Sequence, residues 1–131
     1  MPDDGVLRVV VVRRGKVKPT ELRLRDGEIG LSLFRKAEQP GVEAIIAAVR
    51  AAGKQGDLGA AEIPVSVFRQ LGLRLVPTPG GTREPAVDAL HVEARLSCRW
   101  RLGLWFRRVA ISDWFNENIT PKLAAVAKLV E

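Results

Sequence analysis

The sequence contains one cysteine, one histidine and no tyrosine. The single cysteine, Cys98, cannot form a disulfide within the chain, and there is no second thiol for a zinc cluster or a dithiol pair. His91 and Cys98 cannot make a zinc site together, because a regular strand through both would put them on opposite faces. The sequence therefore predicts no metal site and fits a reducing compartment.

Long hydrophobic runs are also missing. No apolar run approaches the ~20 residues that a membrane-spanning helix needs. The first five residues, Met-Pro-Asp-Asp-Gly, are acidic and lack the apolar core of a secretory signal. These absences predict a cytoplasmic protein without a transmembrane segment. At 131 residues the chain can bury a core, and we expect a single domain over residues 1–131.

Acidic residues are outnumbered by basic ones, and the formal net charge is +6. A positive field favours acidic partners such as a nucleotide, a nucleic acid, an anionic lipid or an acidic protein. Charge alone does not choose among these partners, and a solvated basic surface without any partner explains it equally well.

The strictest pattern in the chain lies in residues 90–96, where apolar and polar side chains alternate. A strand has a side-chain period of two, so one face can pack into a core while the other carries polar groups. That polar face holds His91, Glu93 and Arg95. It is the strongest candidate for chemistry, and it also describes an ordinary half-buried strand.

Further patterns predict the remaining elements. Short strands are expected at 6–12, 20–25, 30–34 and 73–76, with a tight turn at 26–27. Helices are expected from 40 to 53, from 64 to 71, from 112 or 113 to 118, and from 120 onward, while 54–61 and 77–85 are predicted loops. This order predicts an α+β fold with a mostly antiparallel, twisted or split sheet and two or three packed helices, including a C-terminal helix.

Residues 99–108 combine arginines with aromatic residues and contain no acidic residue. The segment could bind nucleic acid through phosphate contacts and stacking, lie on an anionic membrane, or contact an acidic protein. Alternatively, its aromatic residues belong to the core and its arginines are merely solvated. The candidate partner-binding residues are Arg99, Trp100, Arg101, Trp105, Arg107 and Arg108.

Polar residues of the other predicted strands could meet the 90–96 strand. If these strands are neighbours in the sheet, Arg23, Arg25 and Ser32 converge on His91 and Glu93. The alternative is ordinary cross-strand ion pairing on a wet sheet face. The loop 79–83, Pro-Gly-Gly-Thr-Arg, could in addition present backbone N–H groups to an anion, or it could be a plain connection.

The order of the short motifs carries a family resemblance. The motifs are Leu-Arg-Leu-Arg at 22–25, Gly-Leu-Ser-Leu-Phe at 30–34, Gly-Leu-Arg-Leu-Val at 72–76, and His-Val-Glu at 91–93 before a terminal helix. This order resembles the small ADP-ribosyltransferase-like toxins of bacterial type VI secretion and related fungal sets. The chain departs from them at Val92, where these toxins usually have tyrosine, and in having Leu-Arg rather than Tyr-Arg on the early strand.

The resemblance implies a split, curved sheet that grips NAD in a cleft. It implies that Arg23 or Arg25 contacts the phosphate or the nicotinamide ribose, and that Ser32 supports the ribose. Glu93 would activate the transfer, with His91 beside it. The first hypothesis is therefore an NAD-dependent ADP-ribosyltransferase of the toxin or effector type. The second is a non-enzymatic basic module that binds nucleic acid or an acidic protein through residues 99–108.

Overall fold

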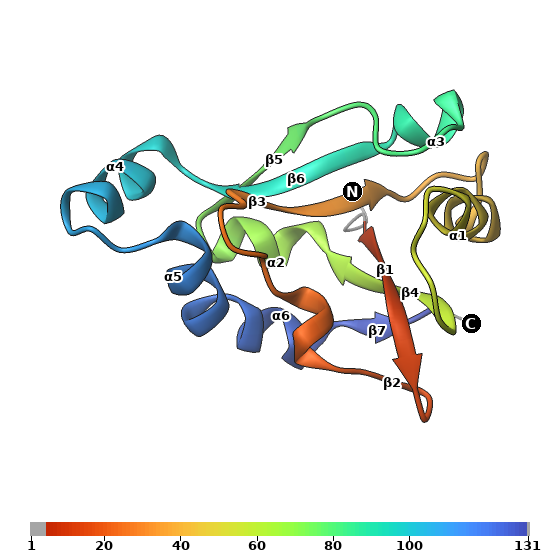
Figure 1. Ribbon diagram of the computed structural model, residues 1–131, viewed down its shortest axis with the longest axis horizontal. Helices are drawn as coiled ribbons and strands as arrows, with labels where there is room; N and C mark the ends of the chain where they lie inside the picture. Colours follow the sequence, from red (N-terminus) through yellow and green to blue (C-terminus); the bar gives the residue numbers. More distant parts are fainter. Residues whose placement is uncertain (1–4, 131) are drawn as a thin grey trace.

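The sheet of the protein is built around its first strand. The computed structural model describes residues 5–130, in which seven strands form an open antiparallel sheet (Figure 1). The strand order is β5-β6-β3-β1-β4-β7, and β2 pairs with the end of β1. The strands are β1 (Gly5–Arg13), β2 (Lys16–Val17), β3 (Gly30–Arg35), β4 (Leu58–Pro64), β5 (Leu73–Pro77), β6 (His91–Leu96) and β7 (Lys128–Leu129).

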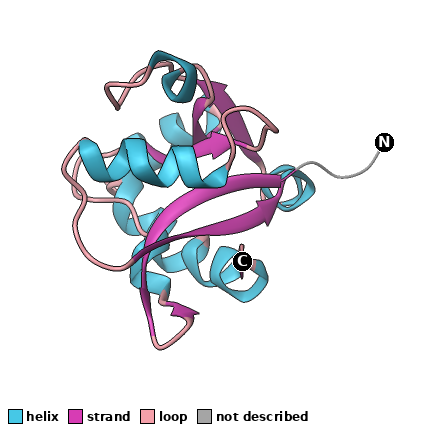
Figure 2. Cartoon of the chain, turned by 90° about the vertical axis from the view of Figure 1, so that its right-hand side faces the viewer, coloured by secondary structure: helices cyan, strands magenta, loops and turns pink. Residues whose placement is uncertain are grey.

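Strand β1 is buried on both faces, as its run of valines predicts. Val6 packs into one hydrophobic core and Leu7 and Val9 into another, because alternate side chains point to opposite faces. Figure 2 shows helices on both sides of the strands. The first core receives Phe68, Leu104, Phe115 and Leu123 from four helices, and the second receives Ile45 and Val87 from two others.

The α+β prediction is confirmed, including the antiparallel sheet and a helix close to the C-terminal end. Residues 5–130 contain six α-helices, more than the sequence patterns indicated, because two of them are short or lack helical periodicity. The helices are α1 (Val42–Ala51), α2 (Val65–Gln70), α3 (Pro85–Asp88), α4 (Cys98–Phe106), α5 (Ile111–Asn118) and α6 (Thr120–Val126). None of these helices is long and apolar enough to cross a membrane.

The sheet is split between β1 and β3. These two strands pair only at Val6–Arg35 and Leu7–Phe34, whereas β1 pairs with β4 along seven residues and β3 with β6 along five. Beyond Leu7 the strands diverge, so the half made of β5, β6 and β3 separates from the half made of β1, β4 and β7 (Figure 1). The space between the halves is where polar side chains collect.

Two local predictions are wrong. Residues 20–25 are not a strand: a 3₁₀ helix covers Pro19–Leu22, and an extended coil follows. The alternation was right about burial, since Leu22 and Leu24 lie in the core and Arg23 and Arg25 are exposed. The structure differs because side chains of α5 and α6, rather than a neighbouring strand, pair with this backbone.

The predicted loop at 54–61 is wrong at its end, because β4 already begins at Leu58. Gly59 in this segment is required by the packing of β4 against β1 and does not indicate a loop. A Cβ at Gly59 would lie 2.7 Å from Cγ2 of Val12 on the neighbouring strand, so only glycine fits there without a shift.

Candidate functional site

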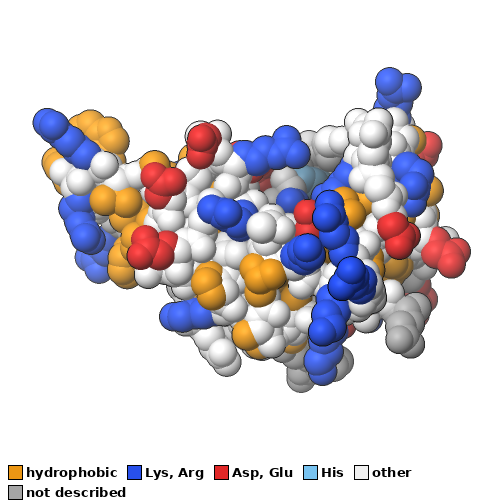
Figure 3. All heavy atoms as spheres, turned by 60° about the horizontal axis from the view of Figure 1, so that its bottom comes forward, with side chains coloured by type: hydrophobic (Ala, Val, Ile, Leu, Met, Phe, Trp, Pro, Cys, Tyr) orange, Lys and Arg blue, Asp and Glu red, His pale blue; other side chains and the backbone are white. Residues whose placement is uncertain are grey.

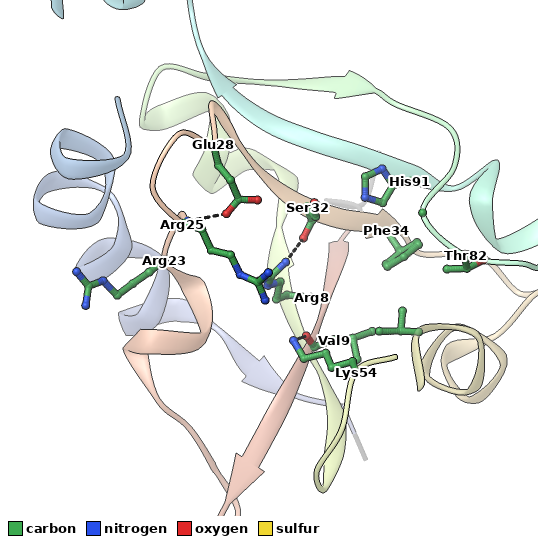
Figure 4. Close-up of a pocket in the computed structure, with 12 residues that line it drawn as sticks. Arg8, Val9, Arg23, Arg25, Glu28, Ser32, Phe34, Lys54, Thr82 and His91 are labelled. Atoms are coloured by element: carbon green, nitrogen blue, oxygen red, sulfur yellow. Dashed lines mark hydrogen bonds between the residues drawn. The ribbon is translucent and has the colours of Figure 1, made fainter. Parts of the chain in front are cut away.

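A cavity of about 290 Å³ opens where the sheet splits (Figure 4). Four of its lining side chains are cationic and one is a carboxylate, so it carries an excess of positive charge. Figure 3 shows Lys and Arg side chains gathered around a hollow beside the histidine. The lining residues are Arg8, Val9, Arg23, Arg25, Glu28, Ser32, Phe34, Val49, Lys54, Gly81, Thr82 and His91.

Arg8 bridges the two halves of the sheet at the bottom of this cavity. Its Nη1 donates a hydrogen bond of 2.9 Å to the backbone carbonyl of Ser32 on β3, and its Nε donates one of 3.1 Å to the carbonyl of Glu21. Burial lowers the pKa of Arg8, and the carboxylates of Glu21 and Glu28 partly offset this effect. Because the groups to which the guanidinium donates are neutral carbonyls, the two carboxylates compensate its positive charge only in part, and an anion would stabilise it further.

Lys54 adds a second cation from the loop after α1. Its Nζ donates to the carbonyl of Val9 at 2.9 Å and lies 3.7 Å from Oε1 of Glu21. Burial lowers the pKa of Lys54, and the positive charge of Arg8 lowers it further. The two cations therefore repel each other, and the nearby carboxylate of Glu21 partly offsets this repulsion. An anionic ligand placed between them would relieve that repulsion.

Arg23 and Arg25 enter this region from the coil after the 3₁₀ helix. Figure 4 shows the Arg25 side chain pointing toward Arg8, and the Arg23 side chain pointing away from both. The coil is fixed by the side chain of Asn116, which accepts from the N–H of Leu24 at 2.7 Å and donates to its carbonyl at 2.9 Å. The sequence pattern does not distinguish Arg23 from Arg25, but the structure does: Arg25 is the one directed into the cleft.

The Asn116 clamp gives a first prediction. Asn116→Ala leaves both backbone groups of Leu24 without their partner, so we expect the free energy of unfolding to fall by about 1–3 kcal/mol in urea denaturation. Asn118→Ala is the matched control on the same helix, because Asn118 makes a single exposed hydrogen bond to the carbonyl of Trp114. Equal losses for the two variants would contradict the clamp.

His91 faces the cleft from the first residue of β6. Its Nδ1 lies 2.7 Å from the carbonyl oxygen of Thr78 and 2.8 Å from the Thr78 hydroxyl. A carbonyl oxygen can only accept, so Nδ1 carries the proton in the neutral ring, and Nε2 is left as the acceptor. The ring packs edge-on against Phe34 with centroids 5.2 Å apart, which fixes its orientation. His91 is thus prepared to accept a hydrogen bond from a ligand hydroxyl.

Ser32 and Glu93 are direct partners across the β3–β6 ladder. Opposed residues of an antiparallel pair project to the same face with Cβ atoms about 4.5–5.5 Å apart, so the two side chains are neighbours. Ser32 lines the cavity, whereas Glu93 is not among its lining residues. Oε1 of Glu93 accepts from Nε of Arg95 at 2.9 Å and from Nη2 at 2.8 Å. The ion pair of this face therefore lies within β6, between Glu93 and Arg95, rather than across two strands, and the face borders the cleft through Ser32.

The sequence-predicted residues therefore meet in part. Ser32, His91 and Arg25 lie together around the cavity, Glu93 is adjacent to Ser32, and Arg23 lines the rim. Sequence reasoning missed Arg8 and Lys54. A signal for Arg8 was present, since a charged residue inside a valine-rich strand buried on both faces needs a special environment. Lys54 follows a helix end and had no signal beyond its charge.

The basic-aromatic segment 99–108 forms α4 and the turn after it. The alternative that its aromatic residues belong to the core is wrong for Trp105 and Phe106, each 71% exposed, whereas Leu104 of the same helix is buried in the core. Cys98, the first residue of α4, is exposed, and its Sγ accepts a hydrogen bond from Nη2 of Arg101. Within residues 5–130 no group of three or more His, Cys, Asp or Glu side chains is arranged to hold a metal ion.

Neither a protein-family model, nor a curated protein, nor a solved structure matches the chain. Function has to be inferred from the side chains of the cleft and of α4.

Proposed function

We propose that the cleft between the two halves of the sheet binds NAD and that the protein transfers ADP-ribose from it. One observation carries the proposal: the split between β1 and β3 opens a cationic cavity directly beside the Ser32–Glu93 pair. The cavity is at the small end of the range for ligand pockets, ~300–1,000 Å³, so it would hold the pyrophosphate and one ribose of NAD while the rest of the dinucleotide lies outside it.

The cationic side supports binding of a pyrophosphate. Arg8, Arg25 and Lys54 are close enough for their charges to interact, and Glu28 is the one carboxylate among the lining residues. Guanidinium groups bind phosphate oxygens in pairs, and in a partly desolvated site such charge-assisted bonds are strong. A neutral ligand would leave the repulsion between these cations in place, so the cavity favours a multiply charged anion.

The β3–β6 side supports transfer chemistry. In the proposed step the bond from ribose C1′ to the nicotinamide nitrogen breaks, and its electron pair leaves with nicotinamide. The acceptor nucleophile forms the new bond to C1′ and gives up its proton. The carboxylate of Glu93 stabilises the positive charge that develops on the ribose and can take that proton, while Nε2 of His91 accepts a hydrogen bond from a ribose hydroxyl.

Ligand-observed NMR of NAD binding tests the proposal with two matched arginine variants. Arg25→Ala should weaken binding roughly 10- to 100-fold, because a charge-assisted hydrogen bond contributes about 1.5–3 kcal/mol. Arg23→Ala is the control, since both arginines are exposed on the same coil and only Arg25 is directed toward Arg8. Absence of NAD binding by the wild type at millimolar ligand, or equal effects of the two variants, would reject the proposed site.

A further inference from the structure

Helix α4 projects from one end of the molecule, opposite the end where α1 lies (Figure 1). It carries the largest exposed apolar side chains of the described residues: Trp105 and Phe106 are each 71% exposed, Leu102 55% and Trp100 49%. In Figure 3 this end shows hydrophobic and basic side chains side by side. Exposed apolar side chains in one contiguous group usually mark a contact surface.

Three of these side chains share the outer side of the helix. Leu102, Trp105 and Phe106 are spaced three and four residues apart, which puts them on one face, while Leu104 points inward to the core. Trp105 and Phe106 also contact each other, with ring centroids 5.2 Å apart. This outer face is a convex apolar ridge rather than a groove that could receive a side chain.

Arginines stand at both ends of the ridge. Arg99 lies in the first turn, and Arg107 and Arg108 follow the last residue of the helix. The sequence has no acidic residue from 96 to 112, so no carboxylate of this segment neutralises them. On the flank, an almost wholly apolar groove of about 310 Å³ runs between Arg99 and Arg107 over Gly103. An apolar floor between two cations is complementary to an anionic amphiphile, which combines an apolar chain with a negatively charged head.

Three kinds of partner fit this surface less well. A second copy docking through the same ridge would set its arginines against identical ones, which repel. A nucleic acid makes no use of Leu102 or of an apolar groove, and Trp100 is already packed on Trp114 with ring centroids 5.2 Å apart. A folded protein would need a groove of its own to receive the convex ridge. A bilayer surface needs none, because side chains insert individually.

We propose that α4 docks on an anionic lipid bilayer, with Leu102, Trp105 and Phe106 inserted at the interface and the flanking arginines on lipid headgroups. Trp and Arg suit this depth, since aromatic rings prefer the interface and each basic residue near an anionic surface adds attraction. Because α4 lies at one end of the molecule, docking there leaves the cleft at the split of the sheet uncovered. The surface and the cleft share no residue, so this inference stands independently of NAD binding.

Co-sedimentation with vesicles tests the proposal on the full chain. Vesicles of equal parts phosphatidylcholine and phosphatidylglycerol should bind the protein, and pure phosphatidylcholine should bind it at least ~10-fold more weakly. Tryptophan emission should shift to the blue on binding, because Trp105 leaves water. The double variant Trp105→Ala, Phe106→Ala should bind anionic vesicles at least ~10-fold more weakly, since a buried aromatic side chain contributes about 1.5–3 kcal/mol.

Two controls separate docking from attraction of a basic protein to any anionic surface. The double variant Arg13→Gln, Arg14→Gln removes two exposed charges at the β1–β2 turn and should change vesicle binding less than about threefold. Trp105→Phe should keep binding and lose most of the blue shift. Equal binding to neutral vesicles, unchanged binding of the aromatic double variant, or tighter binding of single-stranded oligo-dT at the same phosphate concentration would each overturn the proposal.

Discussion

Glu93→Gln should strongly slow the release of nicotinamide from NAD while leaving NAD binding intact. The substitution keeps the size of the side chain and an oxygen that can accept from Arg95. It removes the negative charge that the proposed step uses to stabilise the ribose as nicotinamide leaves. We expect turnover to fall by about 10²- to 10⁴-fold, the range for losing a general acid–base or electrostatic group. Chromatography of released nicotinamide measures this without knowledge of the acceptor, because water can serve as one.

The matched control is Glu62→Gln. Glu62 is also a strand carboxylate with an ion-pair partner, Lys36 at 2.7 Å, but it lies on β4 and does not line the cavity. Its substitution should leave turnover within about twofold of the wild type, since surface ion pairs contribute little to stability or geometry. If Glu93→Gln turned over NAD at the wild-type rate, Glu93 would have no part in the chemistry. A variant that no longer binds NAD would instead mean that the Glu93–Arg95 pair shapes the cleft.

Periodicity in the sequence predicts burial better than it predicts hydrogen bonding. The strand at 91–96 is confirmed because its alternation and its ladder to β3 and β5 coincide. At 20–25 the same alternation gave the correct buried leucines and the wrong backbone state, because Asn116 and Thr120 supply the hydrogen bonds that a strand would have made. Those partners lie more than ninety residues away in the sequence, and a local pattern carries no information about them.

The candidate site shows the same limit in another form. Ser32 and His91 were predicted for one surface, and the register that sets Ser32 opposite Glu93 and Phe34 opposite His91 puts them there. Arg8 lies inside the valine-rich run from Val6 to Val12, whose pattern predicts a strand but does not indicate which groups the guanidinium reaches. A buried arginine is stabilised by the carbonyls to which it donates hydrogen bonds. For Arg8 these carbonyls are accessible because β1 and β3 stop pairing after Leu7. The split of the sheet is a tertiary feature that no single strand encodes.

Helix α4 escaped prediction for a different reason. Its apolar residues are spread around the helix rather than along one stripe, because Leu104 packs inward into the core while Leu102, Trp105 and Phe106 are exposed on the other side. A sequence pattern identifies helices by a single buried face. The exposed aromatic residues interrupt the single apolar stripe by which a helix is recognised in a sequence. The same residues indicate that this helix contacts a partner surface.

Arg8→Met should abolish binding of inorganic pyrophosphate and destabilise the fold. Methionine is of similar length and apolar, so it can fill the space between β1 and β3 but leaves the carbonyls of Ser32 and Glu21 without their donor. Each unpaired carbonyl costs about 1–3 kcal/mol, and relief from burying a charge offsets part of that, so we expect a net loss of about 1–3 kcal/mol in the free energy of unfolding. Arg13→Met is the control on the same strand, because Arg13 is exposed, and it should change stability by less than about 0.5 kcal/mol.

Thermal unfolding with and without pyrophosphate separates the two effects of Arg8. In the wild type, pyrophosphate at ~100-fold its Kd should raise Tm by roughly 5–10 °C, because a ligand that binds only the folded state stabilises it by about 2.7 kcal/mol. Arg8→Met should show no such rise, and Arg8→Lys should show a smaller one, since lysine keeps the charge but cannot donate to both carbonyls and to a phosphate in one plane. A full rise in Arg8→Met would mean that Lys54 and Arg25 bind the anion by themselves, and that Arg8 serves only to hold the two halves of the sheet together.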